Sequence, residues 1–316
     1  MEVITLVLAW KVALPHSVAA LRGNHESRYA VEVYGFKAEL RAKYGAAATK
    51  SLYRGFLKLF ACLPLGARVG RTFIAHGGLF RKAPVARPRA TLAQQAEADQ
   101  EAEQLPLERL GSLEDLRAAK RGGPDPNGIG AAQVATDVLW SDPSVEVRFT
   151  GAHLRRMRAP DARICPQDGL RFNVARGCGL LYGPDATARF LSTNGLRLVI
   201  RSHEGPDARE KRPEMGSMAD GFCEDHATQA GRLVTLFSAP DYPQHVGSGE
   251  ARSRNRAAFA VLHGSDFDEP AVTHFSAAPR PDAPCYYDLD AAGSDEEGPG
   301  TEPHAEVGVA SDADGA

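Results

Sequence analysis

The chain has 316 residues, 43% of them hydrophobic, and a formal net charge of -3. This length holds one large hydrophobic core or two smaller domains. The charge gives no reason to expect nucleic acid or an anionic membrane as a partner. Five widely spaced cysteines without a zinc-type spacing indicate a reducing, intracellular compartment.

The first segment, Glu2 to Ala13, is predicted to be an amphipathic or buried helix. A signal peptide is the alternative, since Val18-Ala19-Ala20 resembles a cleavage site. Glu2 stands where a signal peptide carries basic residues, and Lys11 ends the apolar run early, so the helix is favoured. No stretch of the chain is long enough to span a membrane.

The stretch Leu21 to Ser27 reads LRGNHES, and a short apolar run, Val18 to Leu21, is expected to be a strand leading into it. The side-chain oxygen of Asn24 is a hard metal ligand, and His25 is a ligand or a proton donor. A polar turn with a capping Asn is the alternative interpretation.

Two helices are expected next. From Tyr29 to Tyr44 the apolar residues recur with helical spacing and Gly45 follows as a stop, and Ser51 to Phe60 repeats the pattern. The residues expected to face inward on the first of these helices are Val33, Phe36, Leu40 and Tyr44.

Three segments differ in composition from the rest. Residues 81–136 are rich in Pro, Ala, Gln and Glu, which indicates a surface insertion, partly disordered, with one capped helix from Ser112 to Lys120. Residues 145–173 contain six arginines without clear periodicity, which is typical of a second insertion, either a solvated loop or a basic patch for an acidic partner. Residues 291–316 contain seven acidic residues and no Lys or Arg, so an acidic disordered tail is expected there.

Short apolar strands are predicted at Phe73 to Ala75, Leu196 to Ile200, Leu233 to Phe237 and Ala257 to Leu262. A polar residue able to bind metal or phosphate follows most of these runs. These residues, taken with the first loop, are Asn24, His25, His76, His203 and Tyr242. Because the ends of neighbouring strands in an α/β sheet meet at one crevice, we expect a shared site. An Asn with two His suits Mn, Fe or Zn, which leaves His25 as an acid and Arg176 to hold a phosphate.

The order of six motifs resembles the PPP family of serine/threonine protein phosphatases. They are LRGNHES, HGGL at His76, LWSDP at Leu139, Arg176-Gly177 before Tyr182-Gly183, RSHE at Arg201 and LFSAPDY at Leu236. The longer strings RSHEGPDAREKRP and SAPDYPQ are similar to the plant type-7 class within that family. The resemblance covers residues 1–290 apart from the two insertions.

The resemblance implies an α/β fold of the metallophosphoesterase type, a central β-sandwich flanked by helices. It implies metal-dependent hydrolysis of phosphoserine and phosphothreonine esters in phosphoproteins, with two divalent ions. Asn24, His76 and His203 correspond to ligands of the second ion, and His25 to the residue that protonates the leaving oxygen. Arg176 corresponds to a phosphate-holding residue and Tyr242 to a residue lining the cleft. The class is associated with calmodulin, although the basic amphipathic signature is poor here, and with the nucleus or cytosol.

Two motifs of the family, GDxHG and GDxxDRG, do not occur in the 316 residues. In the family they supply the ligands of the first ion, the bridging carboxylate and the Asp that orients the acid histidine. We therefore expect a truncated catalytic domain without its first strands, with three of four ligands at the second site, that folds poorly alone. A non-catalytic pseudo-phosphatase or partner-binding protein is the alternative.

Overall fold

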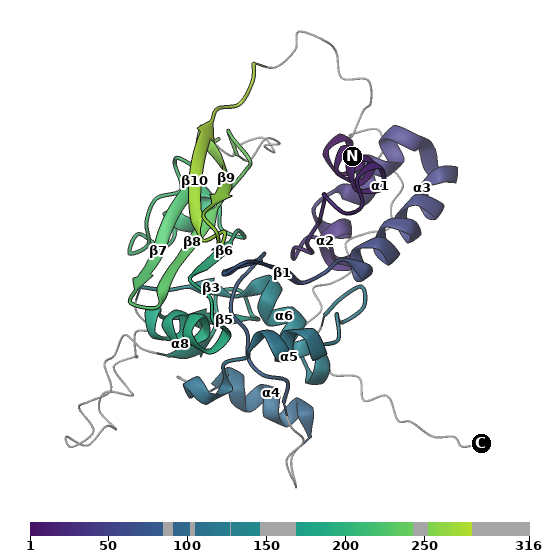
Figure 1. Ribbon diagram of the computed structural model, residues 1–316. Helices are drawn as coiled ribbons and strands as arrows, with labels where there is room; N and C mark the ends of the chain where they lie inside the picture. The colour runs from purple at the N-terminus through teal and green to yellow at the C-terminus, as the bar shows by residue number, and fades with distance from the viewer. Residues whose placement is uncertain (85–90, 102–104, 127, 146–168, 243–251, 280–316) are drawn as a thin grey trace, which may run out of the picture.

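The structure is a computed structural model that describes residues 1–84, 91–101, 105–126, 128–145, 169–242 and 252–279 (Figure 1). Three β-sheets occur in these ranges. The largest has five strands, in the order β1 (Gly66–Val69), β2 (Thr72–Ala75), β6 (Leu198–Arg201), β8 (Gly231–Leu236) and β7 (Phe222–Thr228). The smaller sheets contain β3 (Asp142–Pro143), β5 (Leu180–Tyr182) and β4 (Leu170–Phe172), and β9 (Ala257–His263) with β10 (Glu269–Phe275).

The helices lie at two places around these sheets. In Figure 1, α1 (Glu2–Ala13), α2 (Arg28–Val33) and α3 (Phe36–Cys62) form a group at the upper right. The others are α4 (Leu92–Glu101), α5 (Leu113–Ala118), α6 (Gln133–Trp140), α8 (Pro184–Asn194) and α9 (Pro206–Glu210), with short 3-10 turns η1 (Leu107–Arg109) and η2 (Gly130–Ala132). This mixture of sheets and helices confirms the predicted α/β class.

The centre of the large sheet consists of three parallel strands. Strand β2 pairs with β6, and β6 pairs with β8, so all three end at the same side of the sheet. Successive residues alternate between its faces, as strand geometry requires. Val199 and Leu233 belong to the core cluster that contains α6 and α8, while Leu198 and Val234 belong to a cluster on the other face. Leu262 of β9 packs against that second cluster, so the sheet is covered on both faces.

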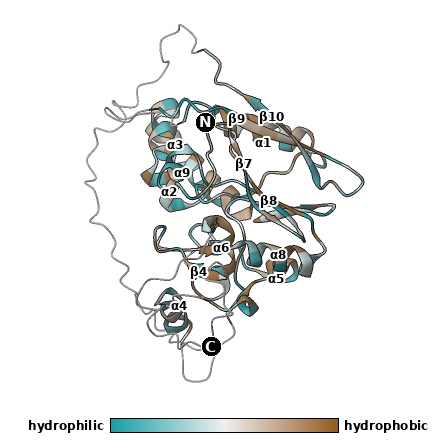
Figure 2. Cartoon of the chain, turned by 90° about the vertical axis from the view of Figure 1, so that its left-hand side faces the viewer, coloured by the Kyte–Doolittle hydropathy of each residue, from teal (hydrophilic) through white to brown (hydrophobic). Residues whose placement is uncertain are grey.

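The core on the helical side draws on residues from the segment 81–136. Leu105, Leu110 and Leu113 are buried in it beside Leu79 and Phe80. Figure 2 shows hydrophobic residues along α6, which begins within the last part of that segment. The interpretation of these residues as a surface insertion is therefore wrong for this part of the segment. The capped helix predicted from Ser112 is confirmed, since Ser112 and Asp115 form a capping box at α5.

The N-terminal helix is present where the sequence predicted it, but it is not buried. Every residue of α1 is exposed or half-buried, and Val12 is 81% exposed. The helix contacts α3 through an ion pair, since the Met1 ammonium group lies 2.7 Å from the Glu39 carboxylate, and Ile4 packs against an apolar cluster that contains Leu57 and Phe60. Within the described ranges, none of the helices combines the length and apolar character that crossing a membrane requires. The strand expected at residues 18–21, which the structure describes, is not formed.

The pair of helices that follows also differs from the prediction. One break occurs at residues 34–35, and α3 then runs through Gly45 with a kink, because Gly45 has a φ of 75°. Leu40 is buried as expected, whereas Val33 and Tyr44 are exposed. The predictions for residues 146–168 within the second insertion, and for the tail at 291–316, lie outside the described residues.

His226 of β7 makes the stability of this fold depend on pH. Its Nδ1 lies 2.8 Å from Thr187 Oγ1 and its Nε2 lies 3.1 Å from the Ser144 carbonyl oxygen. Burial lowers the pKa of His226 from 6.5 to about 4. The unfolded chain thus binds one more proton between these two values, so the stabilisation is complete above pH 6.5 and is lost as the pH falls to about 4.

We expect the free energy of unfolding to fall by about 3 kcal/mol across that interval because of His226. Urea unfolding at a series of pH values measures it. A His226→Gln variant should lose the part of the pH dependence that His226 contributes. His263→Gln, at an exposed position in β9, is the matched control. If His226→Gln shows the same pH dependence of stability as the wild type, this assignment is contradicted.

Candidate metal centre

Three of the predicted ligands meet at the ends of the parallel strands. His76 follows β2 directly, and His203 lies two residues beyond β6. The Oδ1 atom of Asn24 lies 2.8 Å from His76 Nε2, and its Nδ2 atom lies 3.3 Å from His203 Nε2. Asn24 is 5% exposed, and the His203 side chain is 3% exposed. The structure therefore brings the three residues together, and their role as metal ligands stays a prediction.

The turn after β2 is fixed by a close approach of backbone to backbone. The amide of Gly77 donates a hydrogen bond of 2.7 Å to the carbonyl oxygen of Val138 in α6. A Cβ atom at Gly77 would lie 2.7 Å from the same oxygen, which is too close for any side chain. Only glycine therefore allows this contact, which holds the adjacent His76 above the end of the sheet.

The ring of His203 is oriented by a carboxylate that the sequence analysis did not select. Its Nδ1 lies 2.9 Å from Asp142 Oδ1, so Nδ1 carries the proton and Nε2 faces Asn24. Trp140 packs edge-on against the same ring, with 5.6 Å between centroids. His203 adopts a φ of 71°, a conformation that most residues avoid. The surrounding contacts therefore hold this imidazole in place against backbone strain.

Asp142 connects the histidine to two arginines. Its Oδ1 lies 2.7 Å from Arg201 Nη2, and its Oδ2 lies 3.1 Å from Arg176 Nε. Burial alone would raise the pKa of Asp142, but the His203 hydrogen bond and the two arginines hold that pKa well below its usual range. Asn173 also donates to Asp142 Oδ2. Asp142 therefore stays ionised, and it places Arg176 beside the three-ligand cluster.

A buried ion-pair network stabilises the backbone next to His76 and His203. Arg201 and Glu204 are both fully buried, and Arg201 Nη1 lies 2.8 Å from Glu204 Oε2. Arg209 and Arg212 donate to the same carboxylate at 3.0 and 2.6 Å. Arg201 also donates to the Gly77 carbonyl oxygen at 2.6 Å, next to His76. The network thus joins the two strand ends that carry the histidines.

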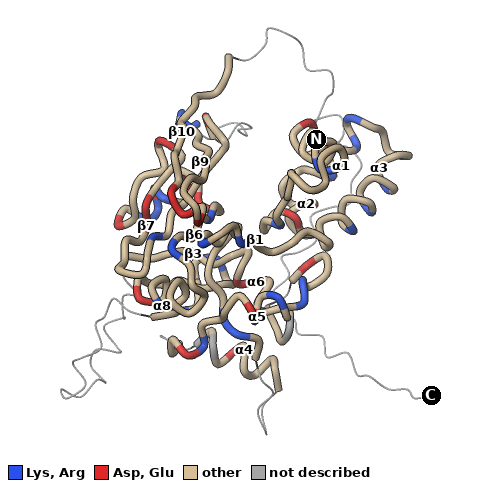
Figure 3. Tube along the Cα trace, in the orientation of Figure 1, with Lys and Arg blue, Asp and Glu red and all other residues tan. Residues whose placement is uncertain are grey.

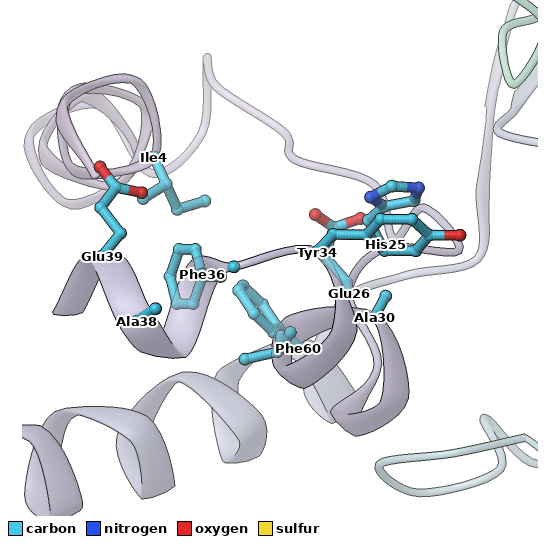
Figure 4. Close-up of a pocket in the computed structure, with 11 residues that line it drawn as sticks. Ile4, His25, Glu26, Ala30, Tyr34, Phe36, Ala38, Glu39 and Phe60 are labelled. Carbon is cyan, nitrogen blue, oxygen red and sulfur yellow. The ribbon is translucent and has the colours of Figure 1, made fainter. Parts of the chain in front are cut away.

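His25 lines a cavity of about 560 Å³. Its ring stacks on Tyr34, with 4.6 Å between centroids, and Figure 4 shows the two rings above Phe60 and Ala30. Burial and the neighbouring His203 lower the pKa of His25. Among the described residues, no carboxylate forms an ion pair with it. His25 is therefore mostly neutral at pH 7 in this chain.

The remaining predicted residues take different positions. The side chain of Arg176 is 30% exposed, so Arg176 can contact a ligand while its Nε stays on Asp142. Tyr242 lies beyond the end of β8 and packs edge-on against Phe237, with 5.2 Å between centroids. Its role in a substrate cleft stays a prediction.

The donor set fits one divalent ion. One amide oxygen and two imidazole nitrogens converge. Burial is the main reason that the pKa of His76 lies well below its usual range, and burial also lowers the pKa of His203. Both histidines are thus neutral, which metal binding requires. Within the described part of the chain, no group of three or more His, Cys, Asp and Glu side chains is close enough to hold a metal ion. The two histidines therefore need the Asn24 amide oxygen as the third donor.

Comparisons with known proteins place these residues in a wider context. Residues 2–207 match the Calcineurin-like phosphoesterase family. Serine/threonine-protein phosphatase 7 of Arabidopsis thaliana is 42% identical over 92% of this chain and 65% of its own length. Serine/threonine-protein phosphatase 5 of Homo sapiens is 31% identical over 89% of this chain and 40% of its own length. The chain therefore spans less than two thirds of the length of these curated relatives.

A solved structure agrees with these matches. It is that of a protein serine/threonine phosphatase from Saccharomyces cerevisiae with similarity to human phosphatase PP5. It aligns with a TM-score of 0.56 at 25% identity, over 89% of this chain and 67% of that one. The metallophosphoesterase fold predicted from the motifs is thereby confirmed.

Proposed function

We propose that this chain, which belongs to the calcineurin-like phosphoesterase family, carries the metal-binding and phosphate-binding residues of a serine/threonine phosphoprotein phosphatase. The observation that carries the proposal is the convergence of Asn24, His76 and His203, with Arg176 joined to His203 through Asp142. The names of the relatives support phosphoserine and phosphothreonine esters as the substrate class.

Each residue has a distinct part in this proposal. Asn24 Oδ1, His76 Nε2 and His203 Nε2 would hold a divalent ion, of the Mn, Fe or Zn type that suits mixed O and N donors. When bound, such an ion stabilises negative charge on the phosphoryl group. Asp142 fixes the His203 tautomer, and the two terminal nitrogens of Arg176 bind phosphoryl oxygens in parallel. His25 would donate a proton to the leaving oxygen.

A non-catalytic phosphoprotein-binding role is the second candidate, and two observations favour it. The described residues supply one set of candidate metal ligands, whereas phosphatases of the two-metal type use two ions. His25 has a lowered pKa and forms no ion pair with a carboxylate of the described chain, so its acid form is scarce at pH 7. Such a chain would hold a phosphorylated segment at Arg176 without cleaving it.

One experiment separates the two candidates. The 316-residue chain is incubated with Mn²⁺ and a phosphothreonine peptide, and both free phosphate and retained peptide are measured. Release of phosphate that disappears in His203→Gln supports the enzyme. Retention without release, lost in Arg176→Ala and kept in Arg54→Ala on the exposed face of α3, supports the binding protein. A chain that neither releases phosphate nor retains the peptide contradicts both.

A further inference from the structure

A second surface of the molecule has the features of a peptide-binding groove. A groove of about 460 Å³ lies between β1 and α5. Five consecutive residues, 64–68, line it on one side, so it follows the strand, and Leu113 and Leu116 line it on the other. Strand β1 is the last in its sheet, with β2 on one edge and no strand of the described chain on the other. Such an edge can pair with an added extended segment.

The rim of this groove is basic. Arg68, Arg117 and Arg121 line it, and all three are exposed. Among the described residues, no acidic side chain lines the groove, and none of the three arginines forms an ion pair with a carboxylate. Figure 3 shows Lys and Arg positions around α5. The floor is apolar, with Leu65 and Phe73. An occupant should therefore be acidic at its edges and carry small apolar side chains.

We propose that this groove binds the acidic C-terminal segment of the same chain, residues 291–316. That segment has seven acidic residues and no Lys or Arg, whereas the whole chain has a net charge of only -3, so the remainder is net positive. Val307 and Val309 lie within the segment beside Glu306. Residues two apart share one face of an extended strand, so both valines can meet the floor while carboxylates meet the arginines.

The connection is long enough for this contact. The turn before β10 touches the turn between β1 and β2, since the Arg71 amide donates to the Asp266 carbonyl oxygen and Thr72 Oγ1 donates to the Phe267 carbonyl oxygen. From there β10 runs seven residues, about 23 Å, away from the groove. Residues 276–290 can span about 50 Å when extended, which exceeds the return distance along β10.

The test uses a fluorescent peptide with the sequence of residues 291–316 and fluorescence anisotropy. One protein is the full chain, and the other is a tail-neutral full chain in which the seven acidic residues of that segment are changed to Asn or Gln. We expect the peptide to bind the tail-neutral chain at least tenfold more tightly, about the effect of a competing tethered ligand, because the native tail occupies the groove. Binding should weaken as salt increases.

Two triple variants of the tail-neutral chain locate the binding site. Arg68→Gln, Arg117→Gln and Arg121→Gln together should abolish binding. The matched control removes the same charge from exposed positions of α3, with Lys50→Gln, Arg54→Gln and Lys58→Gln, and should retain it. Equal loss in both triples, equal binding to the native and tail-neutral chains, or no binding would each overturn the proposal. A native chain that is dimeric at the assay concentration would also overturn it, because the occupant would then be the tail of a second copy.

Discussion

Glu204→Gln is expected to lower the free energy of unfolding by about 3–5 kcal/mol, the usual cost of removing one partner from a buried ion pair. The Glu204 carboxylate is fully buried and accepts hydrogen bonds from Arg201, Arg209 and Arg212. An amide has the same shape but no charge, so the buried guanidinium of Arg201 would keep Asp142 as its remaining ion-pair partner. Urea unfolding followed by circular dichroism measures the change.

Glu210→Gln is the matched control, because Glu210 lies in the neighbouring α9 and is exposed. Its effect should stay within about 0.5 kcal/mol. A Glu204→Gln variant as stable as this control would show that the arginine network does not hold the two strand ends together.

Asp142→Asn is expected to weaken Mn²⁺ binding by about 10–100-fold, as changes to residues that orient metal ligands commonly do. Asp142 accepts a hydrogen bond from His203 Nδ1–H, which leaves Nε2 free for a metal. The asparagine amide keeps the size of the side chain, but it no longer carries the charge that holds Arg176 and Arg201. Isothermal titration of the 316-residue chain with Mn²⁺ measures the affinity.

Asp207→Asn is the control for this change, since Asp207 is exposed in α9. It removes the same charge and should leave Mn²⁺ affinity within a factor of about two. The two variants should also be compared for unfolding, so that a lost metal site is distinguished from a lost fold. If Asp142→Asn binds Mn²⁺ as tightly as the wild type, metal binding by His203 does not depend on its hydrogen bond to Asp142.

The sequence predicted that Asn24, His76 and His203 lie together, but it did not predict the residues that hold them in place. His76 and His203 follow apolar runs, and such runs form buried parallel strands whose ends meet. Asp142 was missed as a site residue because one carboxylate between Ser141 and Pro143 has the composition of an ordinary turn. Its partners are Arg176 and Arg201, far along the chain, and no local pattern carries that information.

Which apolar residues are buried was harder to predict, for a related reason. Helical periodicity identifies one face of a helix, but it does not show what that face contacts. Val33 and Tyr44 were expected inside and are exposed, whereas Leu40 on the same face is buried. Leu110 and Leu113 were missed because the surrounding segment is poor in large apolar residues, yet both pack in the main core.

The most direct test of the metal centre is electron spin echo spectroscopy of Mn²⁺ bound to the 316-residue chain. If His76 and His203 are ligands, the echo should carry nitrogen-14 modulation from two imidazoles. His76→Gln should reduce the modulation to that of one imidazole, and the double variant with His203→Gln should abolish it. Bound Mn²⁺ without nitrogen modulation in the wild-type chain would contradict the site.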